Sequence, residues 1–218
     1  MSRVFKLAIS IFLLLLACGQ DKTVNPDGAG DLIGTLTMNG IPVAGASIQI
    51  DNILNWKATT DESGYFEIKN ITLGEHTFKA YKQSGQNSYA QQESQVYINN
   101  GTNNFGEVRL PIPPKMYEID TLTVTSNSVM LNWTPSYDPE FREYKIYRKY
   151  DPGIDESTGE LIFVSTVPTD TSFNDTRFTS GFKNYYRAYV LSAFGKLGGS
   201  NVISVSTPEI NYLPNGDF

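Results

Sequence analysis

Short runs in which apolar and polar residues alternate fill most of the chain after residue 30. Ile48 and Ile50 alternate with polar neighbours, and Leu131 and Trp133 do the same further along. A period of two places alternate side chains on one face of a β-strand. Turn signals such as Asn39-Gly40 separate the runs. The pattern predicts an all-β chain, and many short strands at this spacing indicate β-sandwiches.

A proline cluster divides this pattern in two. Pro111-Ile112-Pro113-Pro114 resists both helix and central strand, because proline fixes its backbone and lacks an N–H donor. We therefore expect a linker at 111–114 between one domain over 31–110 and a second over 115–207, followed by a tail at 208–218. The linker is short and stiff, so two tandem β-sandwiches should stand end to end as an elongated rod.

The first seventeen residues have the pattern of an export signal. Arg3 and Lys6 precede an apolar run over 7–17. A transmembrane helix takes about 20 apolar residues, so this run is too short to span a bilayer comfortably. It is typical of the apolar region of a secretory signal, and we expect residues 1–17 to be a signal peptide.

The end of that run, Leu15-Leu16-Ala17-Cys18, resembles the lipobox of bacterial lipoproteins. The resemblance implies cleavage before Cys18 and attachment of acyl chains such as palmitate there, which makes membrane lipid a partner. Each buried methylene contributes about 0.8 kcal/mol, and more than one chain gives stable anchoring. An ordinary signal peptide with an incidental cysteine, or an uncleaved anchor, is the alternative.

The residues after Cys18 carry the anchored chain away from the lipid. Residues 19–30 are rich in Gly, Asp and Asn, so 18–30 is predicted to be a lipidated cysteine with a flexible tether of roughly 20 Å reach. Gly19, in place of the aspartate that favours inner-membrane retention in the enteric sorting rule, points to the outer membrane. We expect a lipid-anchored protein of the bacterial cell envelope, at the outer membrane or the cell surface.

A tight hairpin is predicted in the first domain at Thr60-Asp61-x-x-Gly64-x-Phe66. Asp61 can accept backbone amides in the turn, Gly64 supplies a positive φ, and Phe66 returns to the core. With the strands around 41–50, 73–80 and 106–110, this motif resembles the carboxypeptidase regulatory-like family. That resemblance implies a small transthyretin-like sandwich, which in the family accompanies other domains or serves as a surface module.

The second domain resembles fibronectin type III. Residues 128–133 match its second strand, with Trp133 as the core anchor, and 141–148 and 184–190 match later strands. The resemblance implies an immunoglobulin-like sandwich. The sequence departs from the family where a tyrosine corner is usual, because Asn184 stands there and Tyr185 is one residue late.

Composition and charge exclude several kinds of site. The chain has 17 Lys and Arg against 23 Asp and Glu, a formal net charge of -6, which argues against a nucleic-acid partner. One Cys and one His exclude a disulfide framework and Cys- or His-rich metal centres. His76 is in phase with Phe78 and Ala80, so we expect a buried, hydrogen-bonded histidine and not a catalytic one. We expect no enzyme activity and no cofactor.

Four aromatic residues are candidates for stacking on sugar rings. Trp56 lies in a predicted loop, and Tyr81, Tyr89 and Tyr97 lie on polar stretches. Tyrosine on the outer face of a strand is also ordinary β-propensity, which is the alternative.

An acidic loop at 151–160 is the other candidate site. Its carboxylates, Asp151, Asp155, Glu156 and Glu160, could offer oxygen ligands to calcium. Their spacing matches no known calcium loop, so we favour a solvated acidic insertion.

These observations favour a non-catalytic, membrane-anchored surface lipoprotein that acts as a spacer or as an adhesion-type interaction module, with a surface protein or a glycan as partner. One alternative is a carbohydrate-binding lipoprotein that assists extracellular glycan capture. Another is the accessory part of a truncated extracellular enzyme, because residues 213–218 resemble the opening strand of jelly-roll carbohydrate-binding modules.

Overall fold

The computed structural model describes residues 28–85 and 87–209. The predicted signal peptide, Cys18, most of the tether and residues 210–218 of the tail lie outside the described residues. Within the described ranges the chain forms fifteen strands and one 3-10 turn, without an α-helix. In chain order the elements are β1 (Ala29–Met38), β2 (Ile41–Pro42), β3 (Ser47–Ile50), β4 (Lys57–Thr59), β5 (Tyr65–Thr72), β6 (Gly74–Ser84), β7 (Ser88–Ile98), β8 (Gly101–Leu110), η1 (Thr121–Thr123), β9 (Val129–Asn132), β10 (Phe141–Lys149), β11 (Glu160–Ser165), β12 (Ser172–Asp175), β13 (Lys183–Ser192), β14 (Leu197–Gly199) and β15 (Ile203–Ser206).

The first eight strands form a two-layered sandwich. In one layer β1 pairs in parallel with β8 and antiparallel with β5 and β2. The other layer has the order β7-β6-β3-β4. The alternating apolar positions of both layers point inward, as the sequence pattern predicts, and form one buried cluster. Its largest fully buried members are Leu32, Leu36, Ile48, Ile50, Phe66, Ile71, Phe78 and Ile98.

The predicted hairpin at residues 60–66 is confirmed. One carboxylate oxygen of Asp61 accepts hydrogen bonds from the backbone amides of Ser63 at 2.8 Å and Tyr65 at 2.9 Å. The hydroxyl of Ser63, which donates to the same oxygen, lowers the pKa of Asp61, and the two backbone bonds lower it further. Gly64 has φ +76°, and a Cβ there would lie 2.4 Å from the backbone oxygen of Leu36. Only glycine can occupy this turn without a shift of the neighbouring strand.

The remaining strands form a second sandwich around a second buried cluster. One layer contains β11, β10 and β13, with β14 and β15 along the free edge of β13, and the other contains β12 and β9. Trp133 is buried and meets the ring of Tyr144 edge-on, with 5.8 Å between ring centres, so its predicted role as core anchor is confirmed. Asn184, at the unusual corner position, is also buried and its side-chain amide donates to the carbonyl of Phe182 at 3.0 Å.

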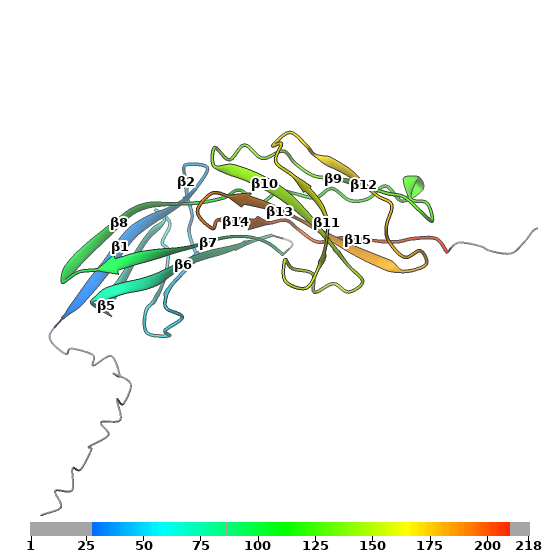
Figure 1. Cartoon of the computed structure of the whole chain (residues 1–218). Helices are drawn as coiled ribbons and strands as arrows, with labels where there is room; N and C mark the ends of the chain where they lie inside the picture. Colours follow the sequence, from blue (N-terminus) through cyan, green and yellow to red (C-terminus); the bar gives the residue numbers. More distant parts are fainter. Residues whose placement is uncertain (1–27, 86, 210–218) are drawn as a thin grey trace, which may run out of the picture.

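The two sandwiches share one sheet. Strand β14 pairs with β13 on one edge and with β7 on the other, so the layers join into a nine-stranded sheet that we call the composite sheet. Residues 111–115 contain no strand, and Gly198 lies against Pro113 of this linker. The described part of the chain is elongated, with its two ends at opposite ends of the molecule (Figure 1). The rod therefore depends on main-chain pairing between the sandwiches as well as on the stiff linker.

Among the described residues, no helix is long and apolar enough to cross a membrane.

Candidate functional site

A third, smaller apolar cluster lies where the sandwiches meet, on the face of the composite sheet that points away from both cores. We call this face the outer face. The buried members of the cluster are Tyr147 of β10, Tyr189 of β13 and Ile154 of the loop between β10 and β11. Tyr89 of β7 and Leu197 of β14 pack against them. The loop therefore covers part of the outer face, which explains why two outward-pointing tyrosines are buried.

Arg187 of β13 fixes this cluster to both sandwiches. Its guanidinium carbon lies 4.7 Å from the ring centre of Tyr89 and 5.4 Å from that of Tyr189. One terminal nitrogen donates to the carbonyl of Ile154 at 3.2 Å, and the other donates to the carbonyl of Asn87 in the first sandwich. A buried guanidinium needs such acceptors, because an unpaired buried charge is costly.

Tyr89 is the matching residue from the first sandwich. Its hydroxyl donates to Glu156 of the covering loop at 3.0 Å, and its ring meets that of Tyr189 with 6.2 Å between centres. Burial, with the adjacent carboxylate of Glu156, raises the pKa of Tyr89 to about 12. The ring of Tyr81 lies next to it, at 5.6 Å between centres.

Cross-strand pairing places a row of side chains along the outer face and across the boundary. Ser47 pairs with Tyr81, Tyr81 with Gln91, Gln91 with Leu197, and Leu197 with Leu191. Directly opposed residues of antiparallel strands point to the same face. Their neighbours along the strands are buried in the cores: Ile48, Ala80, Ala90 and Val190. The row is thus an accessible path that crosses from one sandwich to the other.

Two hollows lie along this path and meet at Gln91. The first, the junction pocket, has a volume of about 290 Å³ and is lined by Gln91, Arg142, Lys145, Tyr147, Glu156, Tyr189, Leu191, Ser192, Gly195, Lys196 and Leu197. The second, the sheet groove, has a volume of about 170 Å³ and is lined by Ser47, Gln49, Lys79, Ala80, Tyr81, Gln91, Gln92 and Glu93. Both combine ring and methyl surface with amide and charged groups.

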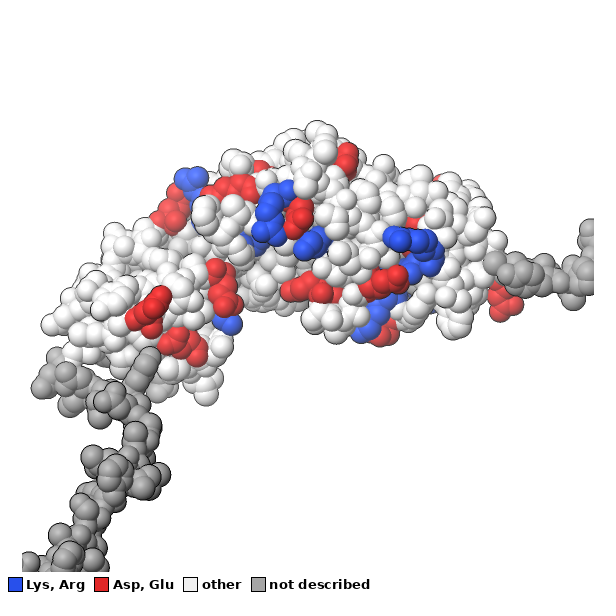
Figure 2. Space-filling view, in the orientation of Figure 1, with Lys and Arg blue, Asp and Glu red and all other residues white. Residues whose placement is uncertain are grey.

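Cationic side chains outnumber acidic ones in the lining of the junction pocket. Arg142, Lys145 and Lys196 line it, against Glu156 alone. Lys196 is almost fully buried and pairs with Glu140. Figure 2 shows Lys and Arg gathered near the middle of the molecule, where β10 and β14 lie, beside carboxylates. The lining cations are paired with such carboxylates, since Glu143 lies 2.8 Å from Arg142 and 3.5 Å from Lys145.

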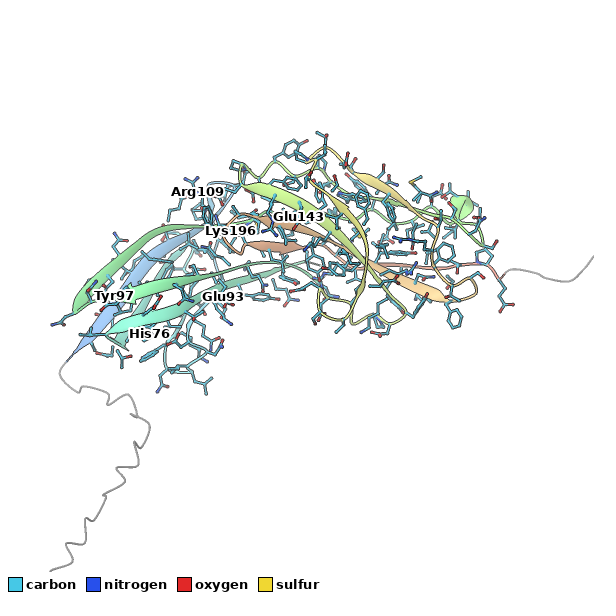
Figure 3. All side chains as sticks on the ribbon, viewed as in Figure 1. His76, Glu93, Tyr97, Arg109, Glu143 and Lys196 are labelled. Atoms are coloured by element: carbon cyan, nitrogen blue, oxygen red, sulfur yellow. The ribbon has the colours of Figure 1, made fainter. Side chains whose placement is uncertain are left out.

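The structure brings together two of the four predicted stacking residues, Tyr81 and Tyr89. Tyr97 is 65% exposed near the far end of β7, away from Lys196 and Glu143 (Figure 3). Trp56 is half-buried in the loop before β4, and its indole nitrogen donates to the carbonyl of Asn70 at 3.1 Å. The four aromatics therefore do not form one platform.

His76 is buried and hydrogen-bonded, as predicted. Its Nδ1 lies 2.6 Å from a carboxylate oxygen of Asp51, and its Nε2 lies 2.7 Å from the carbonyl oxygen of Thr72. The ring of Trp56 meets it edge-on, with 5.4 Å between ring centres. Both ring nitrogens are engaged within the protein, so this histidine holds the end of the first sandwich together.

The acidic loop is mostly exposed to solvent, as predicted, and one buried apolar residue attaches it to the sheet. Ile154 anchors it to the outer face, and Asp155 accepts four hydrogen bonds from the backbone and hydroxyl groups of Ser157 and Thr158. These bonds lower the pKa of Asp155 to about 2. Lys149 pairs with Asp151. Across residues 28–85 and 87–209, no group of three or more His, Cys, Asp or Glu is arranged to hold a metal ion.

Comparison with known proteins gives weak structural likenesses. No family model and no curated protein matches the chain. A human fibronectin type III domain is 19% identical with a TM-score of 0.38, covering 49% of this chain and 86% of that one. A protein from Bacteroides uniformis, proposed to bind carbohydrate, is 9% identical with a TM-score of 0.36, covering 82% and 99%.

The pectate lyase Pel3 from Pectobacterium carotovorum is 16% identical with a TM-score of 0.35. The match covers 43% of this chain and spans about a quarter of the lyase, 27% of its length. Scores this low transfer neither activity nor ligand to this chain.

Proposed function

We propose that this chain is a non-catalytic, membrane-anchored surface protein that acts as a spacer and interaction module. The observation that carries the proposal is the composite sheet, in which β14 pairs with strands of both sandwiches. A sheet that crosses the boundary fixes the angle between the sandwiches. A fixed angle suits a spacer that presents one surface at a set distance from its attachment point.

The contacts around β14 support this rigidity. Gly199 lies between two rings, since a Cβ there would come within 2.8 Å of Tyr89 and 3.0 Å of Tyr189. Asn201 pairs with both backbone groups of Met116, just after the linker, at 2.8 and 3.0 Å. The boundary is therefore packed from the sheet side and from the linker side.

The non-catalytic part of the proposal rests on how the titratable groups are used. The single histidine is engaged by Asp51 and Thr72 inside the first sandwich. Asp175, the fully buried carboxylate of the second sandwich, is engaged by Arg148 and Tyr186. Acid–base catalysis needs a group that can reach a substrate, and these groups are occupied by structural partners.

The anchor and the family assignments belong to the same proposal. Cys18 within Leu15-Leu16-Ala17-Cys18 supports acylation and an outer-membrane or cell-surface location. The Asp61 turn supports a carboxypeptidase regulatory-like domain over 31–110, and Trp133 in its core position supports a fibronectin type III domain over 115–207.

Two measurements test this function. Metabolic labelling with palmitate should mark the wild-type chain and not Cys18→Ser, and the label should follow the membrane fraction. Spin labels at Lys69→Cys and Lys183→Cys, one in each sandwich, should give a single narrow distance distribution by pulsed electron resonance. A broad distribution would contradict a rigid spacer, and an unlabelled membrane-free protein would contradict the anchor.

A further inference from the structure

Three loops meet at the end of the first sandwich where β1 begins, which we call the entry end. They are the loop between β3 and β4 (51–56), the turn between β5 and β6 at Leu73, and the turn between β7 and β8 (99–100). Strand β1 begins beside the end of β5 and the start of β8. A Cβ on Gly28 would lie 2.7 Å from the side chain of Leu73, so the chain enters the sandwich next to these loops.

Hydrogen bonds hold the loop between β3 and β4 in one conformation. Within the loop, the amide of Trp56 donates to the carbonyl of Ile53 at 3.1 Å. At its base, one carboxylate oxygen of Asp51 lies 2.6 Å from Nδ1 of His76, and the other accepts the backbone amide of Thr77 at 2.6 Å. Both partners belong to β6, and Figure 3 shows His76 near the entry end. The tip of the loop is therefore exposed because of how the protein folds.

Large aliphatic side chains are exposed at this tip and at the neighbouring hairpin turn. Leu54 is 74% exposed, Leu73 is 45% exposed and Ile53 is 40% exposed. We call these three residues the apolar rim. Trp56 lies behind the loop and packs against the core of the first sandwich. Several aliphatic side chains exposed at one end of a domain indicate an interaction surface.

The three loops carry almost no charge. Among residues 51–56, 73 and 99–100 the only charged residue is Asp51, which is engaged by β6. The turn at the opposite end of the same sandwich has two exposed carboxylates, Asp61 and Glu62. A surface of aliphatic side chains and neutral amides can enter the boundary between lipid head groups and acyl chains, whereas charged groups are expelled from hydrocarbon.

The charged residues that flank these loops are balanced or engaged. Lys57 and Glu75 are both exposed and carry opposite charges. Their long side chains can keep the charged groups in water while the rim enters lipid. Asp31 accepts the backbone amide of Asn70 at 3.0 Å. The entry end therefore presents no excess of either charge to a membrane.

The position of the rim selects its occupant. Cys18 precedes Gly28 by ten positions. Ten residues of coil span roughly 17 Å, so an acyl anchor at Cys18 would keep the entry end close to lipid. The other end of the described chain lies at the far end of the molecule (Figure 1). The apolar surface that the anchor places against the rim is the bilayer itself.

We propose that the apolar rim enters the surface of the membrane to which the chain is anchored, as a second attachment beside the acylated Cys18. Attachment at two points fixes the tilt of the rod relative to the bilayer, which a tether alone leaves free. Binding strength at such an interface grows with the apolar area that is buried. This inference rests on the proposed membrane anchor and names the surface that the first sandwich presents to lipid.

The test places a nitrobenzoxadiazole label on the rim of the acylated chain in vesicles of phosphatidylethanolamine and phosphatidylglycerol. The label is attached at Leu54→Cys, or at Glu62→Cys at the opposite end of the same sandwich as the control. Acylation blocks Cys18, and the wild-type chain reports any labelling there. Doxyl lipids quench a fluorophore within the bilayer, so they should quench the label at 54 at least threefold more than the label at 62. Equal quenching would overturn the inference.

Matched substitutions test the rim with a label that lies outside the loop, at Leu73→Cys. Leu54→Asp should lower the quenching of this label at least twofold. Ile41→Asp is the control, because Ile41 is also an exposed aliphatic residue but lies on β2, at the other end of β1. Equal losses from the two substitutions would contradict the site. Far-ultraviolet circular dichroism of each variant separates lost lipid contact from lost folding.

Salt distinguishes apolar insertion from charge attraction. Because the rim is uncharged, quenching of the label at 54 should persist when the salt concentration is raised, whereas attraction between exposed charges is screened. Quenching that disappears at high salt would contradict insertion of the rim.

The anchor and the rim can fail separately. A Cys18→Ser chain that carries an N-terminal hexahistidine tag, held on nickel-chelating lipids, repeats the measurement without acylation. Quenching of this chain, together with a wild-type chain that takes up no palmitate, would remove the anchor and leave the rim. An acylated chain whose label at 54 stays in water would remove the rim and leave the anchor, and the exposed residues would then be assigned to a protein or glycan partner.

Discussion

The guanidinium of Arg187 lies 4.7 Å from the ring centre of Tyr89, and the two residues belong to different sandwiches. Arg187 is held on β13 by the ladder of the second sandwich, and Tyr89 is held on β7 by the ladder of the first. A cation over an aromatic face in a desolvated setting contributes about 2 kcal/mol. This contact therefore couples the stability of one sandwich to that of the other.

Arg187→Gln should lower the free energy of unfolding by about 1–3 kcal/mol, because the cation–ring contact and the bonds to Asn87 and Ile154 are lost together. Urea denaturation measures the change. Lys183→Gln is the matched control. The ammonium of Lys183 lies 5.3 Å from the ring centre of Tyr185, but this lysine is exposed, so its loss should change stability by less than about 0.5 kcal/mol. Equal losses of unfolding free energy in the two variants would show that the contacts of Arg187 across the two sandwiches add nothing to stability beyond an exposed cation–ring contact.

Gly64→Ala should destabilise the first sandwich by at least about 2 kcal/mol, because an added Cβ meets the backbone oxygen of Leu36 at 2.4 Å in addition to the strain of a positive φ. Gly40→Ala measures the strain of a positive φ alone. Gly40 has φ +72° but open space around its Cβ position, so this substitution should lower the free energy of unfolding by about 1 kcal/mol. Thermal unfolding of both variants gives the difference, and similar losses would contradict the close approach.

A buried ion pair supports the second sandwich. Arg148 donates to Asp175 at 2.8 Å, and Tyr186 donates to the same carboxylate at 3.1 Å. Arg148→Met should cost about 3–5 kcal/mol, because it leaves a buried carboxylate without its cation. The exposed pair between Lys79 and Glu93 is the control, and Lys79→Met should cost less than about 1 kcal/mol. Chemical denaturation that found similar losses would contradict the burial argument.

Stability should fall at alkaline pH because of the boundary tyrosines. Burial raises the pKa of Tyr89 to about 12 from its ordinary value of 10.0, and it raises that of Tyr189 as well. A raised acid pKa means that the folded state holds the proton more tightly, so this contribution is complete below pH 10 and is lost as the pH rises through about 12. Unfolding free energies between about pH 8 and about pH 11.5 measure the slope. Tyr89→Phe should make the slope shallower, and an unchanged slope would refute this origin.

Local patterns in the sequence predict much of the fold. Alternation predicted the inward residues Ile48, Phe66 and Leu131, and the Asp61 turn and the place of Trp133 were predicted from residue types alone. These features depend on neighbours within a few positions, or on a single face of a strand. Such local features can be predicted from the sequence because backbone geometry fixes which side chains share a face of a strand.

The composite sheet was not predictable in the same way. Leu197-Gly198-Gly199 is too short to show alternation, and its pairing with β7 joins residues about a hundred positions apart. Arg187, Lys145 and Lys196 each look like ordinary strand or turn cations, and only the pairing brings them together. The acidic loop is attached to the sheet by Ile154. The presence of this isolated aliphatic residue among carboxylates is the one feature of the local sequence that points to the attachment.

Strand β14 has a neighbour along each of its sides, and this arrangement bears on solubility. Exposed strand edges recruit matching strands from other copies and lead to aggregation. Without β14, the side of β7 that faces away from β6 would be an eleven-residue strip of free donors and acceptors. By closing part of that strip with a strand of its own, the chain reduces the opportunity for edge-to-edge aggregation at the middle of the molecule.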